Sequence, residues 1–288
     1  MYLLLKLAEL VIKNIPRKAG YFIFTLFGLF SFYTDKKRRD TLKYNLSTAV
    51  GREKATDALL KRVFINYSKY YCDLFMDVNK VLGYIPPKCD EEFRKNTVPI
   101  VEHYLGSGRG CIIISMHYGN WDVAGSYGAS VFKGKMNVVV ERLSEGLFRW
   151  FSEKRTRLGM KVIEATDIKS MIRVLKAGEV LVLLGDRDLD RLGYRMEYFG
   201  KKAYIPSGPA KLSLMTKAPI LVGVARRDEN DNFWPMTNVI GINEEGMERN
   251  DGNAEKITRQ IVSAMEKFVK DDPSQWCMLQ QVFVDDNR

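Results

Sequence analysis

From residue 111 onward, the hydrophobic residues of the chain fall into short runs rich in β-branched side chains, separated by stretches with helical spacing. These runs are CIIIS (111–115), NVVVE (137–141), KVIE (161–164), VLVLL (180–184) and ILVGVA (220–225). Strands of this length that alternate with helices are typical of an α/β layer fold. We therefore predict a central sheet, largely parallel or mixed, that is flanked by helices.

The first part of the chain carries helical patterns instead. Leucines recur at helical spacing in residues 1–15, and Pro16 ends that pattern. An uncharged, aromatic-rich run follows over residues 19–34 and closes with the sequence DKKRR. A third helical stretch, over residues 54–82, places several tyrosines and phenylalanines on one face, which we interpret as core.

Residues 1–44 combine these apolar helices with a basic charge. They carry nine Lys and Arg against three Asp and Glu, which is +6 of the net +10 of the chain. A helix over residues 19–34 would reach ~24 Å at ~1.5 Å per residue, less than the ~30 Å of a bilayer core. Apolar helices with basic flanks are attracted to anionic lipid surfaces. We predict that residues 1–44 form a monotopic or single N-terminal membrane anchor and residues 45–288 a catalytic domain.

Two other interpretations of this segment were weighed. A buried pair of core helices remains open, because short apolar runs also occur in soluble cores. A signal peptide is disfavoured, since no small-residue cleavage site precedes the basic cluster. The position of the charge around an apolar N-terminus favours a membrane over nucleic acid as the anionic partner.

Cysteine and histidine are too few or too scattered for most metal chemistry. The four cysteines show no paired spacing, which indicates free thiols in a reducing compartment. Two histidines exclude a histidine-rich metal site. We expect neither a metal nor a resident cofactor.

His117 stands directly after the first predicted strand, and Asp122 follows five residues later. On a continuous helix these side chains would point about 140° apart at ~100° per residue. Gly119 permits a turn between them, and Asn120 can cap a helix that begins near Trp121. Asp122 would then accept a hydrogen bond from one ring nitrogen of His117 while the other acts as a general base. Taken alone, the pair would equally suit a strand-end histidine with a helix-capping neighbour.

Further charged residues follow other predicted strands. Asp186, Arg187 and Asp188 come directly after residues 180–184, where a charge cluster is hard to explain as core. Two carboxylates one residue apart would also suit a divalent cation, which we hold as a minority alternative. Gly208 lies between two prolines at a tight helix entry, whose free amides could hold an anion.

Four blocks of the sequence resemble one protein family. HYGNWD (117–122) resembles the H-x4-D motif of the glycerolipid acyltransferase superfamily, in the form of its bacterial lipid A and phosphatidylinositol mannoside branch. The other blocks similar to that branch are KYNLSTA (43–49), the stretch 183–221 and PSQWCMLQ (273–280). A Phe-Pro-Glu-Gly element, usual in lysophospholipid acyltransferases, is missing, which favours a glycolipid acceptor.

The resemblance implies an O-acyltransferase that moves a fatty acyl group from an acyl thioester to a hydroxyl of a membrane glycolipid such as a lipid A precursor. The donor, a co-substrate, would be acyl carrier protein or coenzyme A. The place implied is an anionic membrane surface, the cytoplasmic face of the bacterial inner membrane. His117 would be the base and Asp122 its orienting partner. Substrate-binding roles are implied for Asn120, Trp121, Glu141, Arg142, Arg155, Asp186, Arg187, Asp188 and Gly208.

Three alternatives stay open at this stage. The first is a lysophospholipid acyltransferase. The second is a hydrolase of thioesters or lipids that uses the same His and Asp on water, and the third is a non-catalytic lipid-binding protein. A serine nucleophile is disfavoured, because the sequence has no G-x-S-x-G element.

Overall fold

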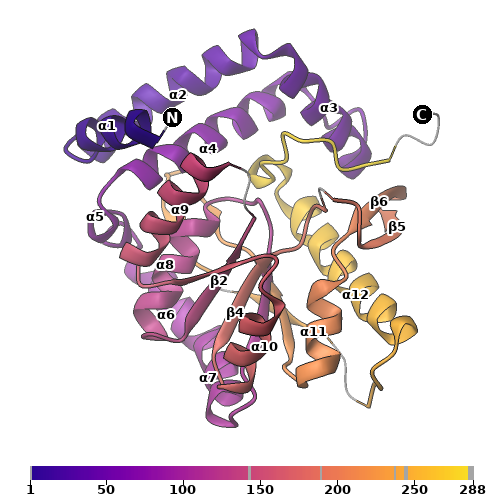
Figure 1. Cartoon of the computed structure of the whole chain (residues 1–288). Coiled ribbons are helices and arrows are strands. Elements are labelled where there is room, and N and C mark those ends of the chain that lie inside the picture. Colours follow the sequence, from indigo (N-terminus) through magenta and orange to yellow (C-terminus); the bar gives the residue numbers. More distant parts are fainter. Residues whose placement is uncertain (1, 142–143, 189, 237, 243–245, 285–288) are drawn as a thin grey trace.

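The computed structural model describes residues 2–141, 144–188, 190–236, 238–242 and 246–284 of the chain. Figure 1 shows a layered α/β body with long helices lying across one end of its sheet. The N-terminal helices are α1 (Tyr2–Ile12), α2 (Arg17–Thr34), α3 (Lys36–Val50), α4 (Asp57–Phe75), α5 (Val78–Leu82), α6 (Pro87–Asn96) and α7 (Val98–Gly106). The later helices are α8 (Trp121–Val131), α9 (Glu145–Arg157), α10 (Ile168–Lys176), α11 (Gly208–Thr216) and α12 (Asp251–Asp271), with a 3₁₀ turn at Pro273–Gln275.

Among the described residues, six strands form the central sheet in the order β10-β7-β1-β4-β2-β3. Their bounds are β1 (Cys111–Ser115), β2 (Met136–Val140), β3 (Lys161–Glu164), β4 (Val180–Leu184), β7 (Ile220–Gly223) and β10 (Val239–Gly241). Every pairing in this sheet is parallel except that of β10 with β7. The predicted α/β fold with a largely parallel sheet and N-terminal helices is therefore confirmed.

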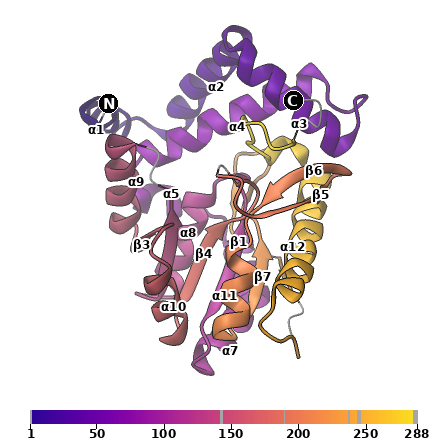
Figure 2. The same cartoon turned by 45° about the vertical axis from the view of Figure 1, so that its right-hand side comes forward.

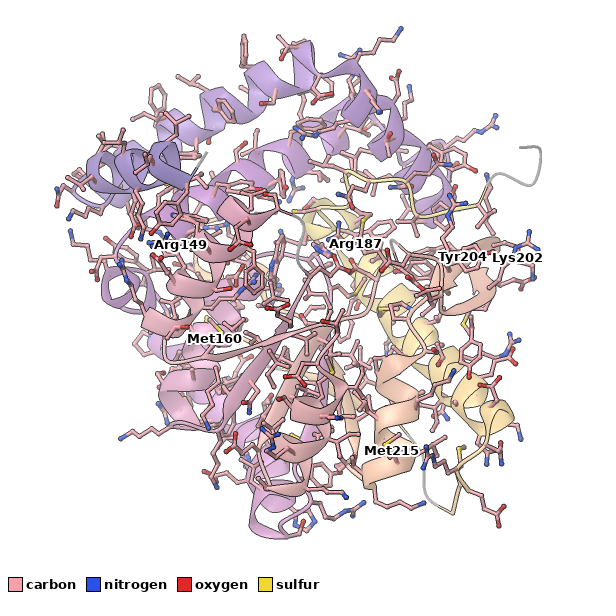
Figure 3. All side chains as sticks on the ribbon, in the orientation of Figure 1. Arg149, Met160, Arg187, Lys202, Tyr204 and Met215 are labelled. Atoms are coloured by element: carbon pink, nitrogen blue, oxygen red, sulfur yellow. The ribbon has the colours of Figure 1, made fainter. Side chains whose placement is uncertain are left out.

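Two short hairpins accompany the sheet. One consists of β5 (Tyr194–Tyr198) and β6 (Lys201–Ile205), and the other of β8 (Arg226–Arg227) and β9 (Phe233–Trp234). Figure 3 shows Lys202 and Tyr204 on the first hairpin, at the edge of the molecule.

The sheet is covered on both faces, which explains why its strands lack alternating polar residues. Ile112 and Ile114 of β1 pack with buried residues of α10, α11 and α12. Ile113, which points to the other face, packs with buried residues of α6, α7 and α8. The carboxyl ends of β1 and β4 are thereby held side by side, next to the N-terminal helices (Figure 2).

Helix α2 lies along α4, and Gly28 explains how closely the two approach. A Cβ at Gly28 would lie 2.9 Å from the Cα of Ile65 and 2.9 Å from the carbonyl oxygen of Phe64. Helix α3 continues the chain into the main core, where Leu42 and Leu46 are fully buried. The predicted boundary between residues 44 and 45 thus falls inside α3. The division into an anchoring and a catalytic part stays a prediction.

The outer faces of α1 and α2 are apolar and exposed. The side chains concerned are between 50% and 74% exposed, and they are Leu3, Leu4, Leu7, Leu10, Val11, Phe22, Ile23, Leu26, Phe27, Phe30 and Tyr33. Within the described residues, no helix has both the length and the apolar character that crossing a bilayer requires.

Candidate active site

The segment from His117 to Trp121 leaves the carboxyl end of β1 and turns sharply into α8. Gly119 has a φ of +58°, and a Cβ there would lie 2.1 Å from the carbonyl oxygen of Ala225, so the turn requires glycine. The side chain of Asn120 accepts a hydrogen bond from the amide of Val123 at 3.1 Å, and α8 begins at Trp121. The turn, the cap and the helix start predicted from the sequence are confirmed.

The ring of His117 is hydrogen-bonded to Asp186. His117 Nδ1 lies 2.8 Å from Asp186 Oδ1, and the backbone amide of His117 donates to Asp186 Oδ2 at 2.9 Å. The parallel register pairs Ser115 of β1 with Leu184 of β4. His117 and Asp186, each two residues beyond this pair, therefore meet at the edge of the sheet. The indole N–H of Trp276 also donates to Asp186 Oδ2, at 3.1 Å.

The prediction that His117 is hydrogen-bonded to Asp122 is wrong. Among the described residues, both side chains have other partners. Asp122 accepts two hydrogen bonds from Arg155 of α9, Nε to Oδ1 at 2.6 Å and Nη2 to Oδ2 at 3.1 Å. It accepts a third from the hydroxyl of Tyr70 of α4, at 2.6 Å. The first turn of α8 directs this carboxylate toward α4 and α9, while the neighbouring strand β4 supplies the carboxylate that reaches His117.

Asp186 is fully buried yet stays ionised. Burial alone would raise the pKa of Asp186. The charge of His117 and the hydrogen bonds from its ring, its amide and Trp276 outweigh that effect, and the pKa lies below its usual value. An ionised carboxylate only accepts hydrogen bonds, so Nδ1 of His117 carries the hydrogen and Nε2 is left able to take a proton.

Tyr70 is the reverse case, a phenol held in its neutral form. Its pKa is raised well above the usual value by burial and by the adjacent carboxylate of Asp122. Tyr70 therefore remains a hydrogen-bond donor to Asp122 at any ordinary pH. Its ring also stacks on Trp121, with the ring centroids 4.0 Å apart.

A cavity of about 390 Å³ opens beside His117. The predicted site residues that line it are His117, Trp121, Glu141, Arg155, Arg187, Asp188 and Gly208. The apolar part of the lining comes from β2, β4, α9, α10 and α11 and from loops next to them: Val139, Val140, Leu147, Phe151, Ala165, Ile168, Met171, Leu183, Leu184, Pro206, Pro209 and Leu212. The remaining lining residues are Tyr67, Tyr70 and Tyr71 of α4 and Gln280. An apolar space next to an acid–base group suits a substrate with a hydrocarbon part.

Three of the predicted residues lie elsewhere. Asp186 stands behind the ring of His117, and Asp122 behind Arg155 and Tyr70. Asn120 is fully buried, and its side-chain amide donates to the carboxylate of Asp73 at 2.8 Å. Arg142 lies outside the described residues. Substrate contacts of these residues stay predictions.

The charged residues of the cavity are largely tied to one another. Arg187 donates from Nη2 to Glu141 at 2.8 Å and from Nη1 to the side-chain oxygen of Gln280. Its Nε is buried and has no partner among the described residues. Asp188 accepts a hydrogen bond from the amide of Gly193 at 2.6 Å. Figure 3 shows Arg187 near the middle of the view, beside the yellow C-terminal segment.

Sequence reasoning did not assign a site role to Tyr70, Trp276 or Gln280. Tyr70 was interpreted as core, which describes its ring but not its hydroxyl. Trp276 and Gln280 lie in the block 273–280, whose family resemblance was the one signal that drew attention to it.

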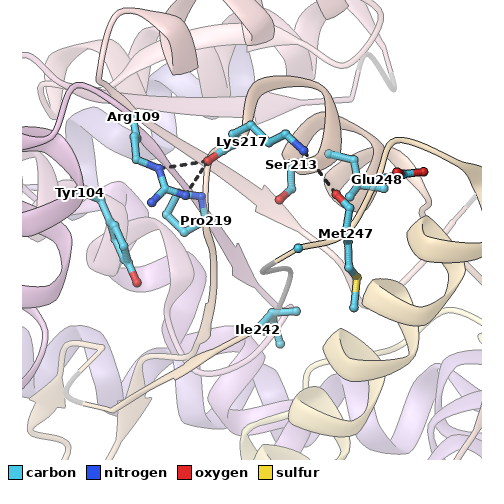
Figure 4. A pocket seen from close by; sticks show the side chains of 10 residues that line it. Tyr104, Arg109, Ser213, Lys217, Pro219, Ile242, Met247 and Glu248 are labelled. Atoms are coloured by element: carbon cyan, nitrogen blue, oxygen red, sulfur yellow. Dashed lines mark hydrogen bonds between the residues drawn. The ribbon is translucent and has the colours of Figure 1, made fainter.

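A larger cavity, of about 600 Å³, is lined by residues of α7, α11 and the loops beside them (Figure 4). None of the predicted site residues line it. Arg109 donates twice to the carbonyl oxygen of Lys217, at 3.0 and 3.3 Å, and the ammonium of Lys217 donates to the carbonyl oxygen of Met247 at 3.3 Å. These basic groups satisfy carbonyls near the end of α11, as is common at helix C-termini.

The known proteins to which this chain is similar are acyltransferases. The model of a family described as bacterial lipid A biosynthesis acyltransferase matches residues 2–284. A phosphatidylinositol mannoside acyltransferase of Mycolicibacterium smegmatis is 29% identical over 258 residues, which are 86% of this chain and 80% of that protein. The protein of the same name from Mycobacterium tuberculosis is 28% identical over 191 residues, 63% of this chain and 57% of its own length.

The family match extends over nearly the whole chain, from α1 to the end of the described residues. It includes the strand ends that carry His117 and Asp186 and the C-terminal block with Trp276. The chain therefore belongs to the bacterial lipid A biosynthesis acyltransferase family, and it is an acyltransferase.

Proposed function

We propose that the protein transfers a fatty acyl group from an acyl thioester to a hydroxyl of a membrane glycolipid, with His117 as general base. The observation that carries the proposal is that Nε2 of His117 has no hydrogen-bond partner among the described residues and that the ring lines a cavity rich in apolar side chains. The family description and the names of the mycobacterial relatives support a glycolipid as the acceptor. The donor is an acyl thioester of acyl carrier protein or coenzyme A.

The reaction follows from the chemistry of the pair. Nε2 of His117 takes the proton of the acceptor hydroxyl while the hydroxyl oxygen attacks the thioester carbonyl carbon. The tetrahedral intermediate collapses, the carbon–sulfur bond breaks, and the leaving sulfur takes the proton from the imidazolium. Asp186 stabilises the imidazolium that exists between these two steps. No covalent acyl-enzyme forms.

The cavity divides the binding of the substrate between apolar and charged residues. The fatty acyl chain occupies the apolar lining between β2, β4, α10 and α11. Arg155 is held by Asp122, whereas the Nε of Arg187, a residue that lines the cavity, has no hydrogen-bond partner among the described residues, so a substrate oxygen that reaches this buried N–H would satisfy it. Glu141 and Gln280 hold the other two nitrogens of that guanidinium.

The N-terminal helices bring the cavity to the lipid. The exposed apolar faces of α1 and α2 lie flat in the interface of the membrane, and the basic start of α3 meets anionic headgroups. Our proposal is that the protein is held in this way on the cytoplasmic face of the inner membrane.

Co-sedimentation with vesicles of anionic and of neutral lipid tests this attachment. We expect Leu26→Ser with Phe27→Ser to reduce the bound fraction severalfold, because both side chains are more than half exposed on α2. Leu192→Ser is the matched control, since Leu192 is 83% exposed but lies outside the N-terminal helices. Equal binding of all three proteins would contradict the proposed docking face.

Acyl transfer from a labelled acyl thioester into membrane lipid extract tests the reaction itself. Wild type should label a glycolipid, and His117→Ala should reduce the rate on the order of 10²–10⁴-fold. His103→Ala is the control, because His103 is exposed on α7 and does not line the cavity. Consumption of the thioester without labelled lipid would indicate a hydrolase, and label in a phospholipid would indicate a lysophospholipid acceptor.

A further inference from the structure

Two family-like blocks of the sequence, around Asn45 and around Trp276, supply no reacting group in the proposed mechanism. Trp276 lies in residues 272–284, which we call the C-terminal strap, and Asn45 of α3 is hydrogen-bonded to this strap. Figures 1 and 2 show the strap leaving α12 and running past α4 toward α3. Its path takes it behind the carboxyl ends of β1 and β4, where His117 and Asp186 lie.

The backbone of the strap holds the turn that carries His117. The amide of Cys277 donates to the carbonyl oxygen of His117 at 2.7 Å, and the amide of Gly119 donates to the carbonyl oxygen of Gln275 at 2.9 Å. Tyr118 and Trp276 form an antiparallel bridge between these two bonds. The main chain is therefore fixed directly after the histidine, on both sides of Tyr118.

The side chain of Trp276 holds the other member of the pair. Its indole N–H donates to Asp186 Oδ2 at 3.1 Å, and both side chains are fully buried. The ring packs against Tyr198 and Phe199, with centroid distances of 6.1 and 5.7 Å. An indole is a donor only, so this bond favours the ionised form of the carboxylate.

The strap is itself fastened to the helices above it. The side-chain amide of Asn45 on α3 is fully buried and donates to the backbone carbonyl oxygens of Met278 at 3.0 Å and Gln280 at 2.8 Å. Asn66 on α4 donates to the carbonyl oxygen of Ser274 at 2.9 Å. The strap thus has a fixed register relative to the pair.

We propose that Trp276 is a positioning residue for the His117–Asp186 pair, which it orients through the hydrogen bond to Asp186, and that Asn45 holds the strap in the register this bond needs. The proposal rests on the proposed function of the pair. It gives the two unexplained blocks of the sequence one shared role.

Two ionisable groups close to Asp186, on β5 and on the strap, are neutral at working pH. Tyr198 on β5 has its pKa raised well above the usual value by burial, by Asp186 and by Glu266 of α12. Burial chiefly raises the pKa of Cys277 to about 12. Charged groups also face this region: Arg227 acts on Cys277. Arg187, which follows Asp186 along the chain, is paired with Glu141. Among the described residues, His117 is the ionisable side chain in hydrogen-bond contact with Asp186. A change at Trp276 therefore acts on a single coupled pair.

Trp276→Phe tests the proposal, because it keeps a ring in the core and removes the N–H. The carboxylate loses a donor to its ionised form, so the pair binds a proton more readily. We expect the acid limb of the pH profile of kcat/KM, measured by acyl transfer, to move up by about one unit, so that kcat/KM falls about tenfold at pH values on that limb. A thermal unfolding curve shows that the variant is folded.

Tyr198→Phe is the matched control, since it removes a buried hydroxyl near Asp186 that has no hydrogen-bond partner among the described residues. Its acid limb should stay at the position of wild type. If Trp276→Phe does not fold, Asn45→Leu decides the matter, with an upward shift expected in it too. An unchanged acid limb in a folded variant would overturn the role of Trp276, whereas a wild type without acyl transfer would overturn the proposed function instead.

Discussion

The two ends of the HYGNWD segment lie five residues apart and have opposite surroundings. One ring nitrogen of His117 has no partner among the residues that the structure describes and faces a largely apolar cavity, and the other nitrogen is hydrogen-bonded to Asp186. Asp122 is 3% exposed, and both of its oxygens are occupied by Arg155 and Tyr70. A reactive group needs a free position, whereas a buried charge needs all of its positions filled. The first end is therefore suited to chemistry, and the second to joining α4, α8 and α9 around it.

The largest expected difference between the two ends is in the rate of acyl transfer. Asp186→Asn should lower kcat on the order of 10⁴-fold, the size of effect seen when the acid behind a catalytic histidine becomes an amide. Asp122→Asn, corrected for the folded fraction, should lose far less. A larger loss for Asp122→Asn than for Asp186→Asn would restore Asp122 as the functional partner of His117.

The next difference is in stability. Asp122→Ala leaves the guanidinium of Arg155 buried without its partner, so the free energy of unfolding should fall by about 3–5 kcal/mol in urea denaturation. Arg155→Met combined with Asp122→Ala should recover part of that loss, because no unpaired charge remains. Additive losses in the double variant would argue against a coupled ion pair.

A smaller effect is expected from the phenol of the same cluster. Tyr70→Phe removes a hydrogen bond to a charged carboxylate and should lower the free energy of unfolding by about 1.5–3 kcal/mol. Tyr33→Phe is a suitable control, because Tyr33 is 62% exposed. The urea midpoints of the two variants separate loss of the buried bond from loss of a hydroxyl in general.

The smallest expected effect is on the stability of the protein at acidic pH. The pKa of Asp186 is lower in the folded protein than in the unfolded chain, so its contribution to stability is complete above the unfolded value of about 3.9 and is lost as the pH falls through the folded value. Thermal unfolding from pH 6 downward should show a shallower loss for Asp186→Asn than for wild type. Parallel curves would mean that the carboxylate gains no stability from His117 and Trp276.

The local features of the site were readable from the sequence, because they depend on neighbours along the chain. Runs of β-branched residues gave the strands, and the position directly after one of them indicated His117. Gly119 and Asn120 predicted the turn and the cap, since both act within three residues. The exposed apolar faces of α1 and α2 likewise follow from residue spacing.

The partners of the reactive group were decided by tertiary structure. Asp186 is 69 residues from His117, and the two meet because β1 and β4 pair in one particular register. Trp276 is 90 residues from Asp186 and reaches it along a strap held by α3 and α4. The sequence shows which charged side chains are available, but the packing of strands and helices selects which carboxylate lies beside the histidine. Asp122 was the nearer residue along the chain, and Asp186 is the nearer one in space.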